Sequence, residues 1–449
     1  MRENTNVRLF RPLLVLGAAA LLVGLGIPNA AATSDPYWNR QYGPVQIGAP
    51  AAWTKSTGAG IKVAVVDSGV DVDHPDLIPN LDRADSYDFG CGDDNPDDDS
   101  TEKDSEDKLV KGHGTHVSGT IAAVANNGIG VAGVAPNVQL MVMKVFPSNP
   151  SCGSFLSALT NVSQSINRAV ERGAKVINLS LSEFQLGNGL FASIETPCNN
   201  AFRSGSLCVV AAGNSGETRS SGYARDFNGI IVTANDSTGA HATFGQRADT
   251  KWGVSAPGVA ILNTWPIDDP DHDGYNAIQG TSMAAPHVAG AAAVLFGMGM
   301  SAQTVAQKLV DTAGPPRDSL VEGAGLIHLD RAAGVQTTAT TNAASRTAGT
   351  GTVTKSGRAG VAGGTGAIAV TTTTSTPGSR EPSTGFEEGL STKDASKDFD
   401  QIQLNQARKN GAGAPFNAAG PLIAGTAIAT LAMLAVAIPR IRAKDTPLT

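Results

Sequence analysis

Charged side chains are scarce in this sequence: they make up 16% of its 449 residues, and acidic residues outnumber basic ones. The formal net charge is −7, with most of the excess negative charge in residues 93–108. A chain of this balance lacks the basic surface that attracts nucleic acid, so we expect no nucleic-acid partner. Its 52 glycines are typical of an exported α/β enzyme with many loops.

The N-terminal segment has the pattern of a secretory signal peptide. Arg2, Arg8 and Arg11 precede an apolar run over residues 13–27, and the small-residue stretch NAAATS follows. This order predicts cleavage after Ala32, so that residues 1–32 are removed on export. An uncleaved membrane anchor is the alternative.

A second apolar run lies near the C-terminus. Residues 418–438 carry no charge and are numerous enough to cross a bilayer as a helix. Arg440, Arg442 and Lys444 follow at once, and the positive-inside rule places the tail 439–449 in the cytoplasm. We therefore expect a single-pass protein of the cell membrane with its body outside; a buried alanine-rich helix is the alternative.

The chain between body and apolar run has little that could form a core. Residues 336–385 are mostly Thr, Ala, Gly and Ser, with almost no large apolar side chains. We interpret 335–417 as a low-complexity flexible linker that joins a folded domain, 33–334, to the membrane.

Cysteine is sparse as well, with four residues in the chain. An even number in an exported protein predicts two disulfides, for which three pairings are possible. We favour Cys198 with Cys208, because a helix and the strand after it can bring them together, which leaves Cys91 with Cys152. A buried free thiol stays open for Cys208, because its surroundings, CVVAA, are typical of a core strand.

The region from about residue 60 to 334 alternates short apolar runs with helical patterns. This rhythm predicts an α/β fold with a mostly parallel central sheet and helices on both faces. In such sheets a site forms where the strands end. The expected buried strands are 61–67, 138–146, 174–181, 207–213 and 229–234.

Three motifs lie at the ends or starts of these elements. VVDSG places Asp67 at the end of the first strand, GHGTHVSGT places His113 in a loop before a helix, and GTSMAAPHVAG places Ser282 at a helix start. Acyl transfer needs a hydroxyl nucleophile, a base and a carboxylate that orients the base. The order of the three motifs along this chain, Asp, then His, then Ser, is that of one known class of such sites. Asn214, in VVAAGNSG, could face the oxyanion. We expect Pro286 within the first turn or so, where a missing N–H costs little.

These motifs together resemble those of the subtilisin-like serine proteases, the subtilases, over residues 37–334. The stretch DPYWNRQYGPVQIGAPAAW resembles the thermitase-like branch in particular. The resemblance implies a serine endopeptidase that cleaves polypeptides through an acyl-enzyme, with Asp67, His113 and Ser282 as the triad and Asn214 in the oxyanion hole. We expect His74, His116 and His287 to be structural.

The resemblance also implies that two extended segments pair with the substrate backbone. They correspond to the region of Gly153 and to Ser180, Leu181 and Ser182. Ser182 departs from the family, whose members commonly have glycine there.

The loop VANNGIGV resembles the family's calcium loop, with one residue more than the usual subtilisin form. The resemblance implies a structural Ca²⁺ held by side-chain and main-chain oxygens. The extra residue leaves the choice between two asparagines open, and a plain polar turn is the alternative. The implied ligands are Asp35, Asp76, Val124, Asn126 or Asn127, Ile129 and Val131.

Two further acidic stretches are weaker candidates for cations. The run 269–274, DPDHDG, lacks the glutamate that closes an EF-hand loop, so a metal site and a plain turn are equally open there. For the insert 93–107 we favour a solvated stretch over one that is folded by cations.

The order of the segments leaves alternatives for the biological role. Only 34 residues separate Ala32 from Asp67, so we expect no folding pro-domain. A subtilase body, spacer and membrane helix are similar to the mycosins, which implies a dedicated processing protease of a secretion system as one alternative. A non-catalytic surface protein on the same scaffold is another. An esterase is disfavoured because Ser282 lacks the G-x-S-x-G elbow.

Overall fold

The computed structural model describes residues 33–100, 111–149, 151–153, 157–181 and 189–335. The predicted signal peptide, linker, membrane span and tail lie outside these residues. Within the described residues no helix combines the length and apolar character that a membrane crossing requires.

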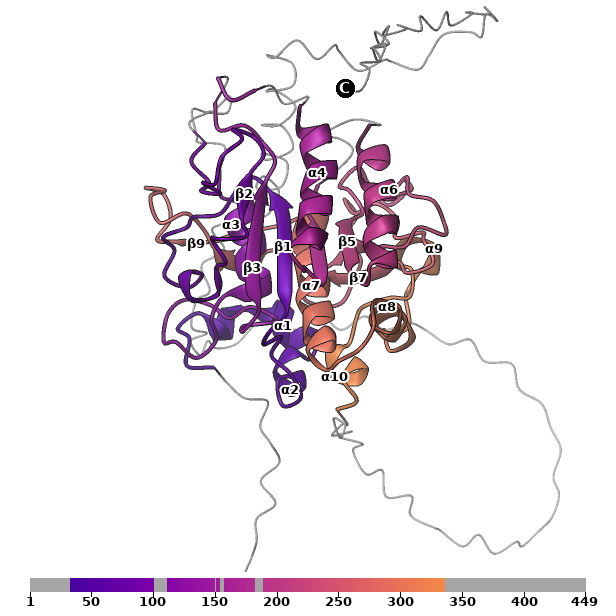
Figure 1. The fold of residues 1–449 in the computed structure, drawn as a ribbon. Coiled ribbons are helices and arrows are strands. Elements are labelled where there is room, and N and C mark those ends of the chain that lie inside the picture. Colours follow the sequence, from indigo (N-terminus) through magenta and orange to yellow (C-terminus); the bar gives the residue numbers. More distant parts are fainter. Residues whose placement is uncertain (1–32, 101–110, 150, 154–156, 182–188, 336–449) are drawn as a thin grey trace, which may run out of the picture. The chain divides into compact units, whose positions relative to one another are not determined.

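A parallel sheet forms the centre of the molecule (Figure 1). Its strand order is β2-β3-β1-β4-β5-β6-β7, and each pair of neighbours is parallel. The predicted α/β fold is therefore confirmed. The strands are β1 (Lys62–Asp67), β2 (Tyr87–Asp88), β3 (Gln139–Lys144), β4 (Val176–Leu179), β5 (Leu207–Ala211), β6 (Ile230–Asn235) and β7 (Val254–Pro257).

Helices cover both faces of the sheet because successive strand residues point to opposite sides. In β1, Val63 and Val65 join one apolar cluster, with α3 (His113–Ala122) and α7 (Thr281–Gly297). Ala64 and Val66 join the other, with α4 (Ala158–Glu171) and α6 (Gly189–Arg203). Figure 1 shows α4 and α6 side by side over their face.

Short elements complete the fold. Two strands that the sequence did not predict, β8 (Ile261–Thr264) and β9 (Tyr275–Ile278), form an antiparallel hairpin apart from the main sheet. The other helices among the described residues are η1 (Trp38–Arg40), α1 (Tyr42–Gln46), α2 (Ala49–Ala52), η2 (Ile78–Asn80), α8 (Ala302–Asp311), α9 (Ser319–Glu322) and α10 (Leu329–Ala332).

Both predicted disulfides are present, Cys91–Cys152 and Cys198–Cys208. Cys198 belongs to α6 and Cys208 to β5, so the second bridge joins a helix to the strand that follows it. The alternative of a free buried thiol at Cys208 is therefore wrong.

Candidate active site

The three candidate catalytic residues stand at the edges of three core elements. Asp67 is the last residue of β1, His113 the first of α3 and Ser282 the second of α7. His113 thus begins the helix, whereas the sequence placed it in the preceding loop. The carboxyl end of a central strand and two helix starts are the expected place for a site in such a sheet.

Asp67 and His113 are joined by a buried hydrogen bond. The distance from His113 Nδ1 to Asp67 Oδ1 is 2.7 Å, and His113 and Asp67 are 4% and 0% exposed. The N–H of Ser68 also donates to Asp67 Oδ1, at 2.8 Å. With its Nδ1 proton held by the carboxylate, a neutral His113 ring can accept a proton only at Nε2.

Ser282 is fixed by contacts with the end of β4. Its hydroxyl donates to the carbonyl of Ser180 at 3.3 Å, and the Ser180 hydroxyl donates to the carbonyl of Ser282 at 2.8 Å. The second contact has a clear cause: Pro286 is the sixth residue of α7 and has no N–H to give to the Ser282 carbonyl. The prediction that Pro286 falls in the first turn was therefore wrong, and the Ser180 hydroxyl replaces the missing donor.

Two hydrogen-bond donors meet beside Gly280. Asn214 Oδ1 accepts from the Thr281 N–H at 2.9 Å and from its hydroxyl at 3.0 Å, which leaves the amide NH₂ to point elsewhere. A Cβ atom on Gly280 would lie 3.5 Å from Asn214 Nδ2 and 3.6 Å from the Ser282 nitrogen. The Asn214 amide nitrogen and the Ser282 main-chain nitrogen therefore both lie close to the space beside Gly280.

The comparisons with known proteins decide the family. A model described as the subtilase family matches residues 58–351. The chain is a subtilase. Thermitase of Thermoactinomyces vulgaris is 38% identical over 284 residues, which is 62% of this chain and 91% of thermitase. A thermophilic serine proteinase of Bacillus sp. (strain AK1) is 36% identical over 288 residues, or 64% of this chain and 65% of that protein.

A solved structure agrees with this assignment. A protease from Pseudoalteromonas arctica PAMC 21717 superposes with a TM-score of 0.54 at 26% identity, over 68% of this chain and 99% of that one. The chain is accordingly a subtilisin-like serine protease, and its enzymatic class is that of a serine-type endopeptidase.

The predicted groove residues of this subtilase are only partly described. Ser180 and Leu181 are buried just after β4, and Gly153 has a positive φ of 150°. Ser182, the departure from the family, lies outside the described residues. The pairing of these segments with a substrate therefore stays a prediction.

The predicted calcium loop is wrapped around two buried carboxylates. Asp35 accepts the N–H groups of Asn126, Asn127 and Gly128 at 2.9, 3.1 and 3.3 Å. Asp76 accepts from Asn127 Nδ2 at 2.7 Å and from the N–H of Val131 at 2.9 Å. Burial, with a smaller contribution from Asp35, raises the pKa of Asp76 to about 6.

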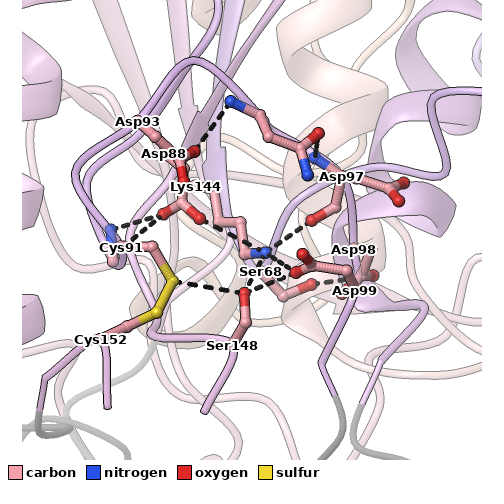
Figure 2. A network of polar contacts seen from close by, with 12 residues as sticks. Ser68, Asp88, Cys91, Asp93, Asp97, Asp98, Asp99, Lys144, Ser148 and Cys152 are labelled. Atoms are coloured by element: carbon pink, nitrogen blue, oxygen red, sulfur yellow. Dashed lines mark hydrogen bonds and ion pairs between the residues drawn. A yellow bond between two sulfur atoms is a disulfide. The ribbon is translucent and has the colours of Figure 1, made fainter. Parts of the chain in front are cut away.

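The described part of the acidic insert, residues 93–100, departs in part from its prediction as a solvated stretch; the rest of the insert lies outside the described residues. Asp93, Asp94 and Asp99 are exposed, as predicted, whereas Asp97 is half-buried and Asp98 is buried. Asp98 is 4% exposed, and Asp97 and Asp99 are held by Lys144 at the end of β3 (Figure 2). The physical reason is a cation supplied by the chain itself: the Lys144 side chain is 1% exposed and neutralises part of the insert. The one signal for it in the sequence was a lysine inside the apolar run 138–146.

The other acidic stretch, 269–274, uses its carboxylates on protein donors. Asp269 Oδ2 accepts from Trp265 Nε1 at 2.6 Å, and Asp273 Oδ2 accepts from the Tyr37 hydroxyl at 3.1 Å. Across the described part of the chain, no group of three or more His, Cys, Asp or Glu side chains is arranged to hold a metal ion.

The remaining histidines of the motifs are structural, as expected. His116 Nε2 contacts the carbonyl of Ile261 at 2.8 Å, and His287 Nδ1 contacts that of Met283 at 2.8 Å. Burial lowers their pKa values to about 3 and about 4, so both rings are neutral at pH 7.

Proposed function

We propose that this subtilase hydrolyses peptide bonds with Ser282 as nucleophile, His113 as general base and Asp67 as the orienting carboxylate. The observation that carries the proposal is the buried Asp67–His113 hydrogen bond at 2.7 Å. It selects the ring tautomer whose Nε2 can take a proton from a hydroxyl.

The reaction then follows from the positions of the donors. Ser282 Oγ attacks the scissile carbonyl carbon while its proton passes to His113 Nε2, and Asp67 stabilises the imidazolium that forms. The negative charge on the former carbonyl oxygen is met by Asn214 Nδ2 and the Ser282 N–H. His113 then returns the proton to the leaving amine, and a water molecule, deprotonated in the same way, hydrolyses the acyl-enzyme.

The test is a pair of variants and a covalent probe. Ser282→Ala should abolish cleavage of an unfolded protein substrate by the full-length chain and labelling by an organophosphonate, because only an activated serine reacts. His113→Ala should also abolish labelling while leaving the hydroxyl in place. Equal labelling of the wild-type chain and Ser282→Ala would refute the proposed nucleophile, and a wild-type chain that neither reacts with the probe nor cleaves the substrate would favour a non-catalytic scaffold.

We further propose that the loop 124–131 holds a structural calcium ion. The residues present fit the ion: two buried carboxylates lie against Asn127, and no hydrogen bond in the described part of the chain is accepted by the carbonyls of Val124, Ile129 or Val131. The side chain of Asn127 lies against Asp76, whereas the side-chain oxygen of Asn126 accepts the N–H of Ser34, which favours Asn127 over Asn126 as the side-chain ligand. The ion would supply positive charge that cross-links the N-terminal segment to this loop.

A chelator test distinguishes this from a plain turn. Because an ion that binds only the folded state stabilises it, removing calcium from Ser282→Ala should lower the melting temperature, and Asp76→Asn should reduce that response. An unchanged melting temperature on chelation would refute the site.

Export and tethering remain proposals from the sequence. They are supported by the apolar run 418–438 with its basic flank and by the signal-like residues 1–32. In cells, the full-length chain should sediment with membranes, whereas a chain truncated before residue 418 should appear in the medium. Recovery of both forms in the cytosol would contradict the proposal.

A further inference from the structure

A segment of the acidic insert lies directly along the loop that follows Asp67. The N–H of Val70 donates to the carbonyl of Pro96, and the N–H of Asp98 donates to the carbonyl of Val70, both at 3.0 Å. A Cβ on Gly69 would lie 3.0 Å from the Asp97 carbonyl oxygen, and Gly69 has a φ of 119°, so only glycine allows this approach.

This contact carries the carboxyl of Asp98 to the back of the catalytic site. Asp98 Oδ2 accepts the N–H of Gly112 at 2.7 Å and the hydroxyl of Ser68 at 3.2 Å. Oδ1 has no hydrogen-bond partner within the described part of the chain, although it is buried.

The Ser68 hydroxyl extends this contact by one further residue. It accepts the N–H of Gly114 at 3.1 Å while donating to Asp98. Gly112 and Gly114 are the neighbours of His113 on either side. One carboxyl oxygen therefore holds the main chain before His113 directly and the main chain after it through a single hydroxyl.

We propose that Asp98 is a positioning residue of this protease: it fixes the main chain on both sides of His113 and so keeps the imidazole aligned with Asp67. The inference rests on the proposed triad. Asp98 does not touch the reacting atoms, so its effect must appear through His113.

The segment that carries Asp98 is fastened to the sheet by Lys144, as Figure 2 shows. The Lys144 ammonium donates to the carbonyl of Asp97 and to the Ser148 hydroxyl, both at 2.6 Å, and pairs with Asp99. Asp88 Oδ2 lies 3.5 Å away. A buried cation thus fixes both residues that flank Asp98, which explains how an insert can hold a side chain in a defined place.

The hydrogen bonds to Oδ2 do not depend on the charge of Asp98. Burial raises its pKa to about 7; the bond from Gly112 and the charge of Lys144 lower it, and Asp67 raises it. The other charged groups on the described elements around it are Asp97 and Asp99 of its own segment, Asp71 and Asp73 of the loop after Asp67, Lys111 and His113 beside Gly112, and Asp268. Because Oδ1 has no partner among the described residues, it can carry the proton while Oδ2 keeps both bonds, so asparagine is a close mimic of the protonated form.

The experiment compares four variants of the full-length chain on one chromogenic peptide substrate. Asp98→Ala should lower kcat about 100-fold with KM changed less than about 3-fold, because a displaced base slows the chemical step. Asp98→Asn should restore kcat to within about 3-fold of the wild type. Ser68→Ala, a smaller change, should lower kcat about 10-fold. Asp97→Ala is the matched control, since its carboxylate accepts the Val72 N–H and, among the described residues, makes no hydrogen bond to the chain beside His113, so its kcat should stay at the wild-type level.

A readout at His113 separates this inference from the proposed function. The pKa of His113, followed by NMR of the ring in the Ser282→Ala background, should be lower by about one in Asp98→Ala than in Asp98→Asn. Both variants lack the charge, so the difference reports only the alignment with Asp67. Equal kcat values and equal His113 pKa values in these two variants would overturn the inference, even if Ser282 is the nucleophile. If Asp98→Ala does not fold, the Ser68→Ala variant tests the inference in its place. A wild-type kcat together with an unchanged His113 pKa in Ser68→Ala would also overturn the inference.

Discussion

Asp98 should make this protease less stable as pH rises, and replacing it with asparagine should remove that dependence. The carboxyl is buried, and its pKa of about 7 lies above the ordinary value of 3.8. Between these two values the folded state keeps a proton that the unfolded state has lost. Stability therefore falls as pH rises through this window and is level above it.

The magnitude follows from the two pKa values. A pKa difference of one between the folded and unfolded chain is worth about 1.4 kcal/mol in the free energy of unfolding. Part of the range between the two pKa values lies below pH 4.5, so the free energy of unfolding should fall by about 3 kcal/mol between pH 4.5 and 8.5. Asparagine does not titrate. The free energy of unfolding of Asp98→Asn, relative to that of its parent, should thus be about 3 kcal/mol higher at pH 8.5 than at pH 4.5. The other titratable groups contribute equally to both chains and cancel in this comparison.

The assay is urea unfolding of the Ser282→Ala chain, which cannot digest itself, with and without Asp98→Asn. Free energies of unfolding at pH 4.5, 6, 7 and 8.5 give the difference at each pH. A difference that varies by less than about 1 kcal/mol over this range would refute the reasoning, because Asp98 would then titrate alike in the folded and unfolded chain. A carboxyl that lowers stability yet supports kcat is the pattern expected of a functional residue.

Three further predictions follow from the site and its supports. Asn214→Ala should lower kcat by about 10²–10³ with little change in KM, measured by steady-state kinetics, because its amide acts only on the oxyanion. Ser180→Ala leaves the Ser282 carbonyl without its donor and should cost about 1–3 kcal/mol in urea unfolding, with a lower rate of phosphonate labelling; wild-type values for both would contradict the role assigned to this hydroxyl. Replacing Cys91 and Cys152 by serine should lower the free energy of unfolding by about 4 kcal/mol, because the bridge closes a loop of 61 residues and so restricts the unfolded chain. Calorimetry without a reductant measures this difference; equal stability of the two chains would mean that the loop is already restricted in the unfolded chain.

The fold and the candidate triad could be predicted from sequence because their signals are local. Asp67 ends an apolar run, and Ser282 lies at the start of a long apolar helix. In each case the neighbouring residues are enough to show where the motif lies in its strand or helix. The cysteine pairs were predictable for similar reasons, since Cys198 and Cys208 belong to successive elements.

The supports of the site were not predictable, because they join residues that are far apart in the chain. Nothing near Asp98 indicates that it reaches Ser68, 30 positions away, or that Lys144 neutralises its neighbours. A run of carboxylates in a sequence looks solvated until the cation that pairs with it is known. The position of Pro286 in its helix was not predicted for a related reason. The donor that compensates for its missing N–H is the Ser180 hydroxyl, 102 positions from the Ser282 carbonyl that accepts it.

The bridge between Cys91 and Cys152 has a consequence for how damage to this enzyme would look. A chain whose own activity can cut it is at risk of internal nicks. Any single cut between these two cysteines, a stretch that contains Asp98 and His113, leaves the two pieces covalently joined. Such a molecule would migrate as intact on a non-reducing gel and separate into two bands only after reduction. Preparations judged whole without a reductant could therefore contain nicked enzyme.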